Sequence, residues 1–109
     1  DVVLRTLAEV VKAEIRDQDA GCRYGGEEFA VVFPHVAADR TCKAAHRIRQ
    51  NFAGQTFQPD GGASISVTIS IGLAQLRPEE DAADLIRRTD QALYQAKHQG
   101  KNRVVAARD

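Results

Sequence analysis

An unbroken alternation of side chains near the middle of this 109-residue chain limits its fold more strongly than any other pattern in it. Apolar residues occupy every second position, and small or polar residues stand between them. A β-strand turns successive side chains to opposite faces, so this run predicts a strand over residues 65–74. Its small, polar face suits a sheet with helices on one side and a ligand or another surface on the other. The apolar positions are Ile65, Val67, Ile69, Ile71 and Leu73.

Three other segments carry the apolar spacing of amphipathic helices. Asp1 is placed as the N-cap of the first, and glycines close the second and third at Gly54 and Gly100. Pro78 and the three acids after it open the third helix. The three segments are residues 2–15, 38–52 and 78–99. The expected buried stripe of the third is Leu85, Ile86, Thr89, Leu93 and Ala96.

A hairpin is predicted between residues 21 and 34, which read GCRYGGEEFAVVFP. β-branched and aromatic residues flank Gly25 and Gly26, a pattern typical of two strands joined by a tight turn. Val104 and Val105 supply a short closing strand. This order of elements predicts an α+β fold with a split βαβ arrangement, a mostly antiparallel central sheet and helices that cover one face.

The charge balance excludes several classes of partner. Fifteen basic and fifteen acidic side chains cancel, so we expect no DNA binding and no direct contact with a membrane. No apolar run approaches the ~18 residues of a membrane span. Cys22 and Cys42 do not make a disulfide framework, which favours a reducing, cytosolic compartment.

The length is that of one domain, residues 1–109. The chain contains no methionine and Asp1 stands directly before a helical pattern, so we interpret it as a piece of a longer protein. Its three histidines share no metal-ligand spacing with the cysteines. No Walker, dinucleotide-binding or Gly-x-Ser-x-Gly motif is present.

The predicted hairpin tip is the segment best suited to chemistry. Gly25 and Gly26 can let a ligand touch bare backbone, and they stand directly before Glu27 and Glu28. Mg²⁺ prefers carboxylate oxygens together with phosphate oxygens, so two adjacent acids at a turn can supply a metal ligand and a base. In a regular strand these two acids would point to opposite faces, so both reach one site only if the turn bends the chain. The alternative is a hairpin with solvated acids.

Four motifs along the chain resemble those of the GGDEF-domain diguanylate cyclases, in the GGEEF variant. The hairpin segment is similar to the family's GG(D/E)EF signature, and the start of the chain to the helix after its Gly-Asp pair. The alternating run resembles VTxSIGxA, and the end of the third helix resembles ALYxAKxxGxNxV. In this chain the four segments are Arg23–Phe29, Asp1–Ala8, Val67–Ala74 and Ala92–Val104.

The resemblance implies a nucleotidyl cyclase palm-like fold and a reaction. Two GTP molecules are condensed into cyclic di-GMP with release of pyrophosphate, each 3′-hydroxyl attacking the α-phosphorus of the opposite nucleotide. Each domain holds one GTP, so catalysis needs a homodimer. The alternative is a catalytically inactive GGDEF domain that acts as a cyclic di-GMP receptor or a protein-interaction module.

The resemblance also implies roles for residues at the hairpin and at the first helix. Glu27 is the metal-bound acid and the base for the 3′-hydroxyl, and Glu28 is a second contact to Mg²⁺ or Mn²⁺. Gly25 and Gly26 let the nucleotide approach the backbone. Asp1 matches the acid that reads the guanine edge; as a residue by itself, it would simply cap the helix.

Two lysines match the family's phosphate-binding pair. Lys97 and Lys101 are four apart at the end of the third helix, which would place both on one face. A solvated helix end is the alternative. Lys101 stands where the family more often has arginine, so a fork-shaped phosphate contact becomes a point-charge contact. The family's metal-binding aspartate lies on a first strand that, together with a helix, precedes the region matched here, and this sequence does not contain it.

A second site follows from the same resemblance. Arg16 and Asp19 form an Arg-x-x-Asp pattern ahead of the hairpin, where the family carries its product-inhibition site, and Arg47 matches the arginine that completes it. Arg16 could contact a guanine edge or a phosphate, and Asp19 could accept from guanine. Without the family context, an Arg-x-x-Asp pattern at a helix end is more often a surface ion pair.

Overall fold

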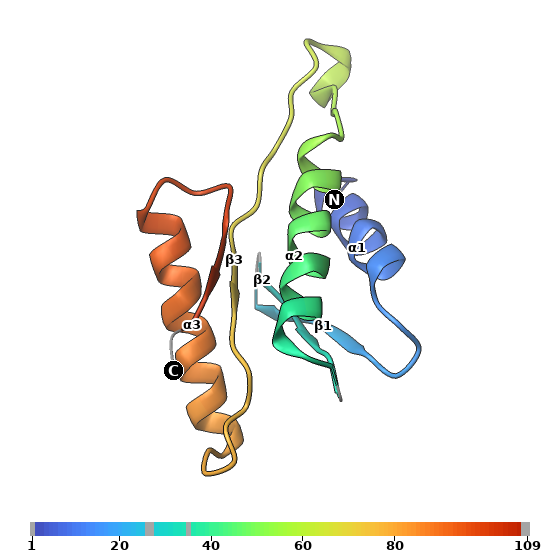
Figure 1. Ribbon diagram of the computed structural model, residues 1–109. Helices are drawn as coiled ribbons and strands as arrows, with labels where there is room; N and C mark the ends of the chain where they lie inside the picture. The colour runs from blue at the N-terminus through green and yellow to red at the C-terminus, as the bar shows by residue number, and fades with distance from the viewer. Residues whose placement is uncertain (1, 26–27, 35, 108–109) are drawn as a thin grey trace.

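The computed structural model describes residues 2–25, 28–34 and 36–107, which form helices and short strands (Figure 1). The helix predicted from residue 2 is α1, and the other two predicted helices are also present. Pro59–Gly61 forms a short 3-10 turn, η1. The α-helices are α1 (Val2–Glu14), α2 (Ala38–Ala53) and α3 (Ala82–His98). The strands are β1 (Ala20–Gly25), β2 (Glu28–Val32), β3 (Ile71–Leu73) and β4 (Val104–Ala106).

The predicted hairpin is confirmed as an antiparallel pair of β1 and β2. Its register runs from Ala20 opposite Val32 to Gly25 opposite Glu28. The register shifts between Arg23 and Gly25, because two steps along β1 match one step along β2. This is the geometry of a β-bulge, which bends a strand locally.

The predicted strand over residues 65–74 is shorter in the structure. Only Ile71–Leu73 pair as β3, in parallel with β4, and Ile65 makes an isolated bridge with Phe57. A strand is defined by paired backbone groups, and β4 offers a partner over only three residues. Among the described residues, the strands form two separate two-stranded sheets, β1–β2 and β3–β4.

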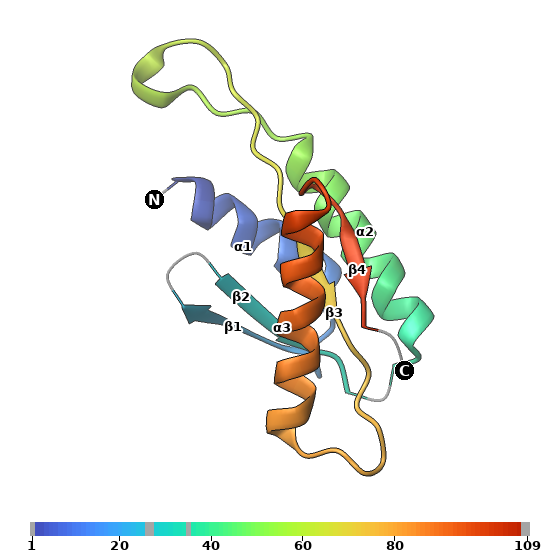
Figure 2. The same cartoon turned by 90° about the vertical axis from the view of Figure 1, so that its left-hand side faces the viewer.

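Helices lie on both sides of the β3–β4 pair, which corrects the expectation of one covered face. Figure 1 shows β3 between α2 and α3, and Figure 2 gives the view turned by 90°. A Cβ atom at Gly72 would lie 2.3 Å from the backbone nitrogen of Leu93 in α3. The small face of the alternating run therefore packs directly against a helix.

The opposite face of the run packs toward α1 and α2. Phe52 is 1% exposed, and its ring centroid lies 6.1 Å from that of Phe57. Together with Leu7 they form a buried cluster, which half-buried apolar side chains surround. Those surrounding residues are Val3, Val10, Val11, Phe29, Val67 and Ile69.

The buried stripe of α3 differs in part from the predicted one. Ala92 and Ala96 are buried, whereas Ile86 is 44% exposed, so its assignment to the core is wrong. The described part of the chain contains no helix that is long and apolar enough to cross a membrane.

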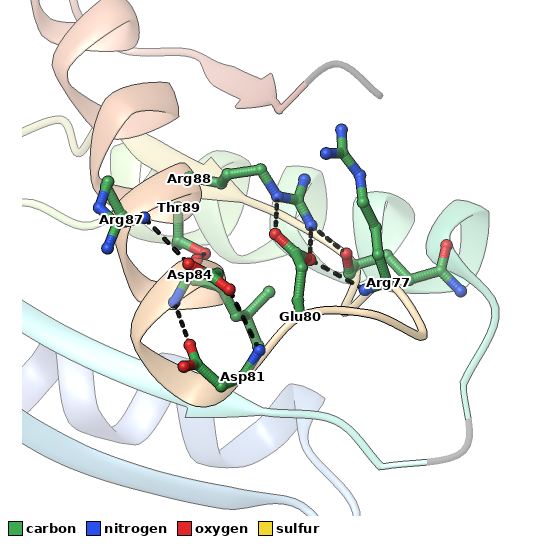
Figure 3. A network of polar contacts seen from close by, with 9 residues as sticks. Arg77, Glu80, Asp81, Asp84, Arg87, Arg88 and Thr89 are labelled. Carbon is green, nitrogen blue, oxygen red and sulfur yellow. Dashed lines mark hydrogen bonds and ion pairs between the residues drawn. The ribbon is translucent and has the colours of Figure 1, made fainter.

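The segment before α3 is held by polar contacts rather than by an earlier helical turn (Figure 3). Asp81 caps the helix, accepting from the Asp84 backbone N–H at 2.9 Å, while the Asp84 side chain accepts from the Asp81 N–H at 3.3 Å. The Arg88 Nε and Nη2 atoms each donate to Glu80 at 2.6 Å, and Nη2 also donates to the Gln75 carbonyl. The helix therefore begins at Ala82 rather than at Pro78, because Glu80 folds back onto α3.

Candidate nucleotide site

The hairpin turn predicted to hold the reacting groups is closed by the pairing of Gly25 with Glu28. Gly26 and Glu27 stand between them and lie outside the described residues, as does Asp1. The bulge in β1 lies directly before this turn, between Arg23 and Gly25.

The acids at this turn have the donor chemistry that a hard divalent cation requires. Carboxylate oxygens are the preferred ligands of Mg²⁺ and Mn²⁺, and Glu28 opens β2 next to the turn. Within residues 2–25, 28–34 and 36–107, no group of three or more His, Cys, Asp or Glu side chains could hold a metal ion.

The two predicted phosphate-binding lysines do not share a helix face as their spacing suggested. Lys97 is exposed in the last turn of α3, but the helix ends at His98. Lys101 lies beyond it with φ 61°, in a turn that reverses the chain toward β4. The two lysines are not on one helix face because Gly100, with φ 123°, ends the helix before Lys101.

Local hydrogen bonds define the turn that carries Lys101. The Lys101 N–H donates to the Ala96 carbonyl at 3.0 Å, a bond across the helix end typical of a Schellman closure. The Arg103 Nε donates to the Lys101 carbonyl at 3.1 Å, and the Arg103 carbonyl accepts from Ile71 N–H at 2.9 Å. The turn is thus attached to β3.

Arg16 and Asp19, predicted together from their spacing, are in direct contact just after α1. The Arg16 Nη2 donates to Asp19 Oδ1 at 2.7 Å, and the Arg16 backbone N–H donates to Oδ2 at 2.7 Å. Nη2 also donates to the Pro34 carbonyl at 3.0 Å, which ties this segment to the end of the hairpin. The Asp19 side chain is fully buried, whereas that of Arg16 is 41% exposed.

This contact sets the charge state of both groups. The hydrogen bonds from Arg16 lower the pKa of the Asp19 carboxyl below its ordinary value, against the opposing effect of desolvation. The same hydrogen bonds raise the pKa of Arg16. The pair is therefore fully ionised at neutral pH and presents an oriented guanidinium at the surface.

Arg47, the third residue predicted for this second site, reaches the same end of α1 from α2. Its Nε donates to both carboxylate oxygens of Glu14, at 2.8 and 3.1 Å. Glu14 lies two positions before Arg16, so α1 brings the two arginines to one region. Glu14 could not be found from the sequence, because an acid at the end of an amphipathic helix gives no local signal for a partner 33 residues away.

Comparison with known proteins identifies the family of this chain. The family described as "Diguanylate cyclase, GGDEF domain" matches residues 1–103. The chain belongs to the GGDEF-domain family. Its relatives include "Diguanylate cyclase A" of Treponema denticola, 37% identical over 110 residues, and the response regulator PleD of Caulobacter vibrioides, 41% identical over 107 residues. The chain spans 29% and 24% of the lengths of these two proteins, while 100% and 96% of the chain is matched.

Solved GGDEF structures confirm the expected α+β nucleotidyl cyclase palm fold. The GGDEF domain of DgcB from Caulobacter crescentus, solved in complex with c-di-GMP, superposes with a TM-score of 0.92 at 33% identity. That match covers 97% of this chain and 63% of the DgcB chain. The active GGEEF domain of a Vibrio cholerae diguanylate cyclase gives a TM-score of 0.84 at 34% identity, covering 100% of this chain and 69% of the other.

Proposed function

We propose that this chain is the catalytic domain of a diguanylate cyclase that condenses two GTP molecules into cyclic di-GMP. The observation that carries the proposal is the tight hairpin closed by Gly25 and Glu28, which in this sequence encloses Gly26 and Glu27. A family match over residues 1–103 supports the same reaction. Each 3′-oxygen forms a bond to the α-phosphorus of the opposite GTP as the bond to the departing pyrophosphate breaks.

In this proposal the acids at the turn serve the reacting oxygen. Glu27 accepts the proton of the 3′-hydroxyl, and Glu27 and Glu28 hold a divalent cation, Mg²⁺ or Mn²⁺. The bound cation supplies charge neutralisation for the phosphates. Gly25 and Gly26 have no side chains to exclude the nucleotide from the backbone, and Asp1 accepts hydrogen bonds from the guanine edge.

The opposite end of the nucleotide meets the lysines of the C-terminal segment. Lys97 and Lys101 bind the phosphates that leave as pyrophosphate, and both are exposed. Each domain holds one GTP, so two copies must face one another for each hydroxyl to reach its phosphorus. A homodimer is therefore part of the proposed mechanism.

Product inhibition is proposed to act through Arg16, Asp19 and Arg47. The buried Asp19 carboxylate fixes the Arg16 guanidinium, and Arg47 stands beside the same end of α1. Two exposed guanidinium groups suit the phosphates and guanine edges of cyclic di-GMP. The DgcB domain has been solved with c-di-GMP bound, which supports a binding role for this fold.

The reaction is tested by measuring pyrophosphate release and cyclic di-GMP formation from GTP and Mg²⁺ with the full-length protein. Glu27→Gln is expected to lower the rate by at least about 100-fold, because it removes a general base and a metal ligand. Glu79→Gln, the same change at an exposed acid before α3, is the matched control and should leave the rate unchanged.

Equal rates for the parent and Glu27→Gln would remove Glu27 from its role. A parent protein that forms no pyrophosphate but binds cyclic di-GMP would favour the second candidate, a receptor domain. The observation that supports the receptor candidate is the Arg16–Asp19 pair, because binding of cyclic di-GMP through this pair does not require the catalytic turn.

A further inference from the structure

The turn that carries Lys101 has an unusual backbone. Gly100, Lys101 and Asn102 have consecutive positive φ angles of 123°, 61° and 48°. Residues other than glycine rarely adopt positive φ angles, although asparagine tolerates them better than most residues. Residues held in such conformations persist only where the surrounding structure fixes them.

One contact to this turn comes from a distant element. Arg49, on α2, donates from Nη1 to the Asn102 Oδ1 atom at 3.0 Å, across 53 positions of sequence. Other hydrogen bonds of the turn join it to the end of α3, to itself and to β3. Arg49 therefore connects the Lys101 turn to α2, and through α2 to the core around Phe52.

The surroundings of the Arg49 side chain are partly unfavourable for a charged group. It is half-buried, and its Nε atom is buried without a hydrogen-bond partner in the part of the chain that the structure describes. A buried unpaired N–H opposes folding, whereas the hydrogen bond from Nη1 to Asn102 orients the side chain. The contact from Arg49 fixes the position of the Asn102 side chain, and Asn102 directly follows Lys101.

We propose that Arg49 is a positioning residue for nucleotide binding, acting through Asn102 to hold the turn from which Lys101 reaches the phosphates. The inference rests on the proposed function, in which Lys101 binds those phosphates. Lysine is a point charge on a flexible chain, so the placement of its backbone decides where its ammonium group can act. Lys97 needs no such anchor, because α3 itself fixes its backbone.

The test measures binding of 3′-deoxy-GTP with Mg²⁺ to the full-length protein by calorimetry. This nucleotide has the phosphates and the base but lacks the attacking hydroxyl, so binding is measured without turnover. Lys101→Ala is expected to weaken binding about tenfold and Arg49→Ala about fivefold, and the double variant should bind as Lys101→Ala does. Arg40→Ala, an exposed arginine on the same helix, is the matched control and should bind as the parent does.

A second pair of variants separates positioning from folding. Asn102→Gly keeps the positive φ but removes the acceptor, so it should weaken binding as Arg49→Ala does, whereas Asn102→Asp keeps an acceptor and should retain the parent affinity. Circular dichroism checks that each variant folds. If Arg49→Ala does not fold, the two Asn102 variants decide whether the contact positions Lys101.

The outcomes distinguish the two proposals. Parent-like binding by Lys101→Ala would remove Lys101 from the proposed site and overturn this inference with it. Weak binding by Lys101→Ala together with parent-like binding by Arg49→Ala, or with losses that multiply in the double variant, would overturn the positioning role alone.

Discussion

At Gly72 the backbones of a strand and a helix approach each other closely. A Cβ atom there would lie 2.3 Å from the Leu93 nitrogen and 2.7 Å from the Thr89 carbonyl oxygen, both of them backbone atoms. Backbone cannot rotate aside as a flexible side chain can. The glycine in the alternating run therefore fixes the distance between β3 and α3.

Gly72→Ala is expected to destabilise the chain by about 3 kcal/mol, because the added methyl group forces α3 away from β3. Urea unfolding followed by circular dichroism measures the change. Gly54→Ala is the control: its φ is −79° and its nearest contact would be 3.6 Å, so it should be neutral or slightly stabilising. Similar stabilities for the two variants would contradict the close-approach argument.

Arg47→Ala is expected to weaken cyclic di-GMP binding at least about tenfold, because a guanidinium that contacts the product is lost. The Arg47 side chain is 54% exposed in its pair with Glu14, so the free energy of unfolding should change by less than about 1 kcal/mol. Calorimetry and urea unfolding measure the two effects, with Arg40→Ala as control. Unchanged affinity would exclude Arg47 from the proposed product site.

At the scale of elements, the segment that leads into α3 combines a capping box with a nearly buried ion pair. Glu80 is 8% exposed and Arg88 is 14% exposed. The hydrogen bonds from Arg88, helped by the Arg77 backbone N–H, lower the pKa of Glu80 from 4.5 to about 2. This contact links residues 75–80 to the helix and so fixes the connection between β3 and α3.

The lowered pKa predicts a pH dependence of stability. Because folding lowers the pKa of Glu80, its contribution to stability is fully present above pH 4.5 and is lost as the pH falls toward about 2. Glu80→Gln should therefore give a lower stability at neutral pH and a shallower fall in the free energy of unfolding between these values. Urea titrations at several pH values measure the slope, and Glu79→Gln should keep the parent slope. An unchanged slope in Glu80→Gln would show that this carboxyl is not the source.

Local patterns predicted the elements better than their ends and partners. Apolar spacing was sufficient for α1 and α2, and the Gly25-Gly26 pair was sufficient for the hairpin. The start of α3 could not be predicted, since it depends on Glu80 meeting Arg88 eight positions away. The contact between Arg49 and Asn102, which are 53 positions apart, could not be predicted either, because nothing in the local sequence of either residue specifies the other.

The whole molecule exposes more surface to solvent than a compact monomer of this mass is expected to expose. The accessible area is 7482 Å², against about 5,900 Å² expected for a compact monomer. The radius of gyration is 14.4 Å, compared with about 13 Å expected for this length. Within the described residues, β2 and β3 do not pair with each other, and Val32 on β2 is 61% exposed.

We therefore expect the isolated 109-residue chain to self-associate through its open strand edges. Sedimentation velocity over a range of concentrations measures this. Val32→Lys should reduce association by placing a charge on the β2 edge, whereas Val2→Lys should not, because Val2 is equally exposed at 62% but lies on α1. A chain that stays monomeric at all concentrations would contradict the expectation.

The parallel β3–β4 pair and its connecting helix occupy one continuous stretch of chain, residues 71–106. Pairing β1 with β2 closes a loop of only two residues, whereas pairing β3 with β4 closes residues 74–103, so loop-closure entropy favours the hairpin and the β3–β4 pair forms later. Amide protons of the hairpin should then gain protection from exchange with solvent before those of β3 and β4 during refolding. The segment proposed to hold the departing phosphates would reach its final place only after α3 has returned the chain to β3.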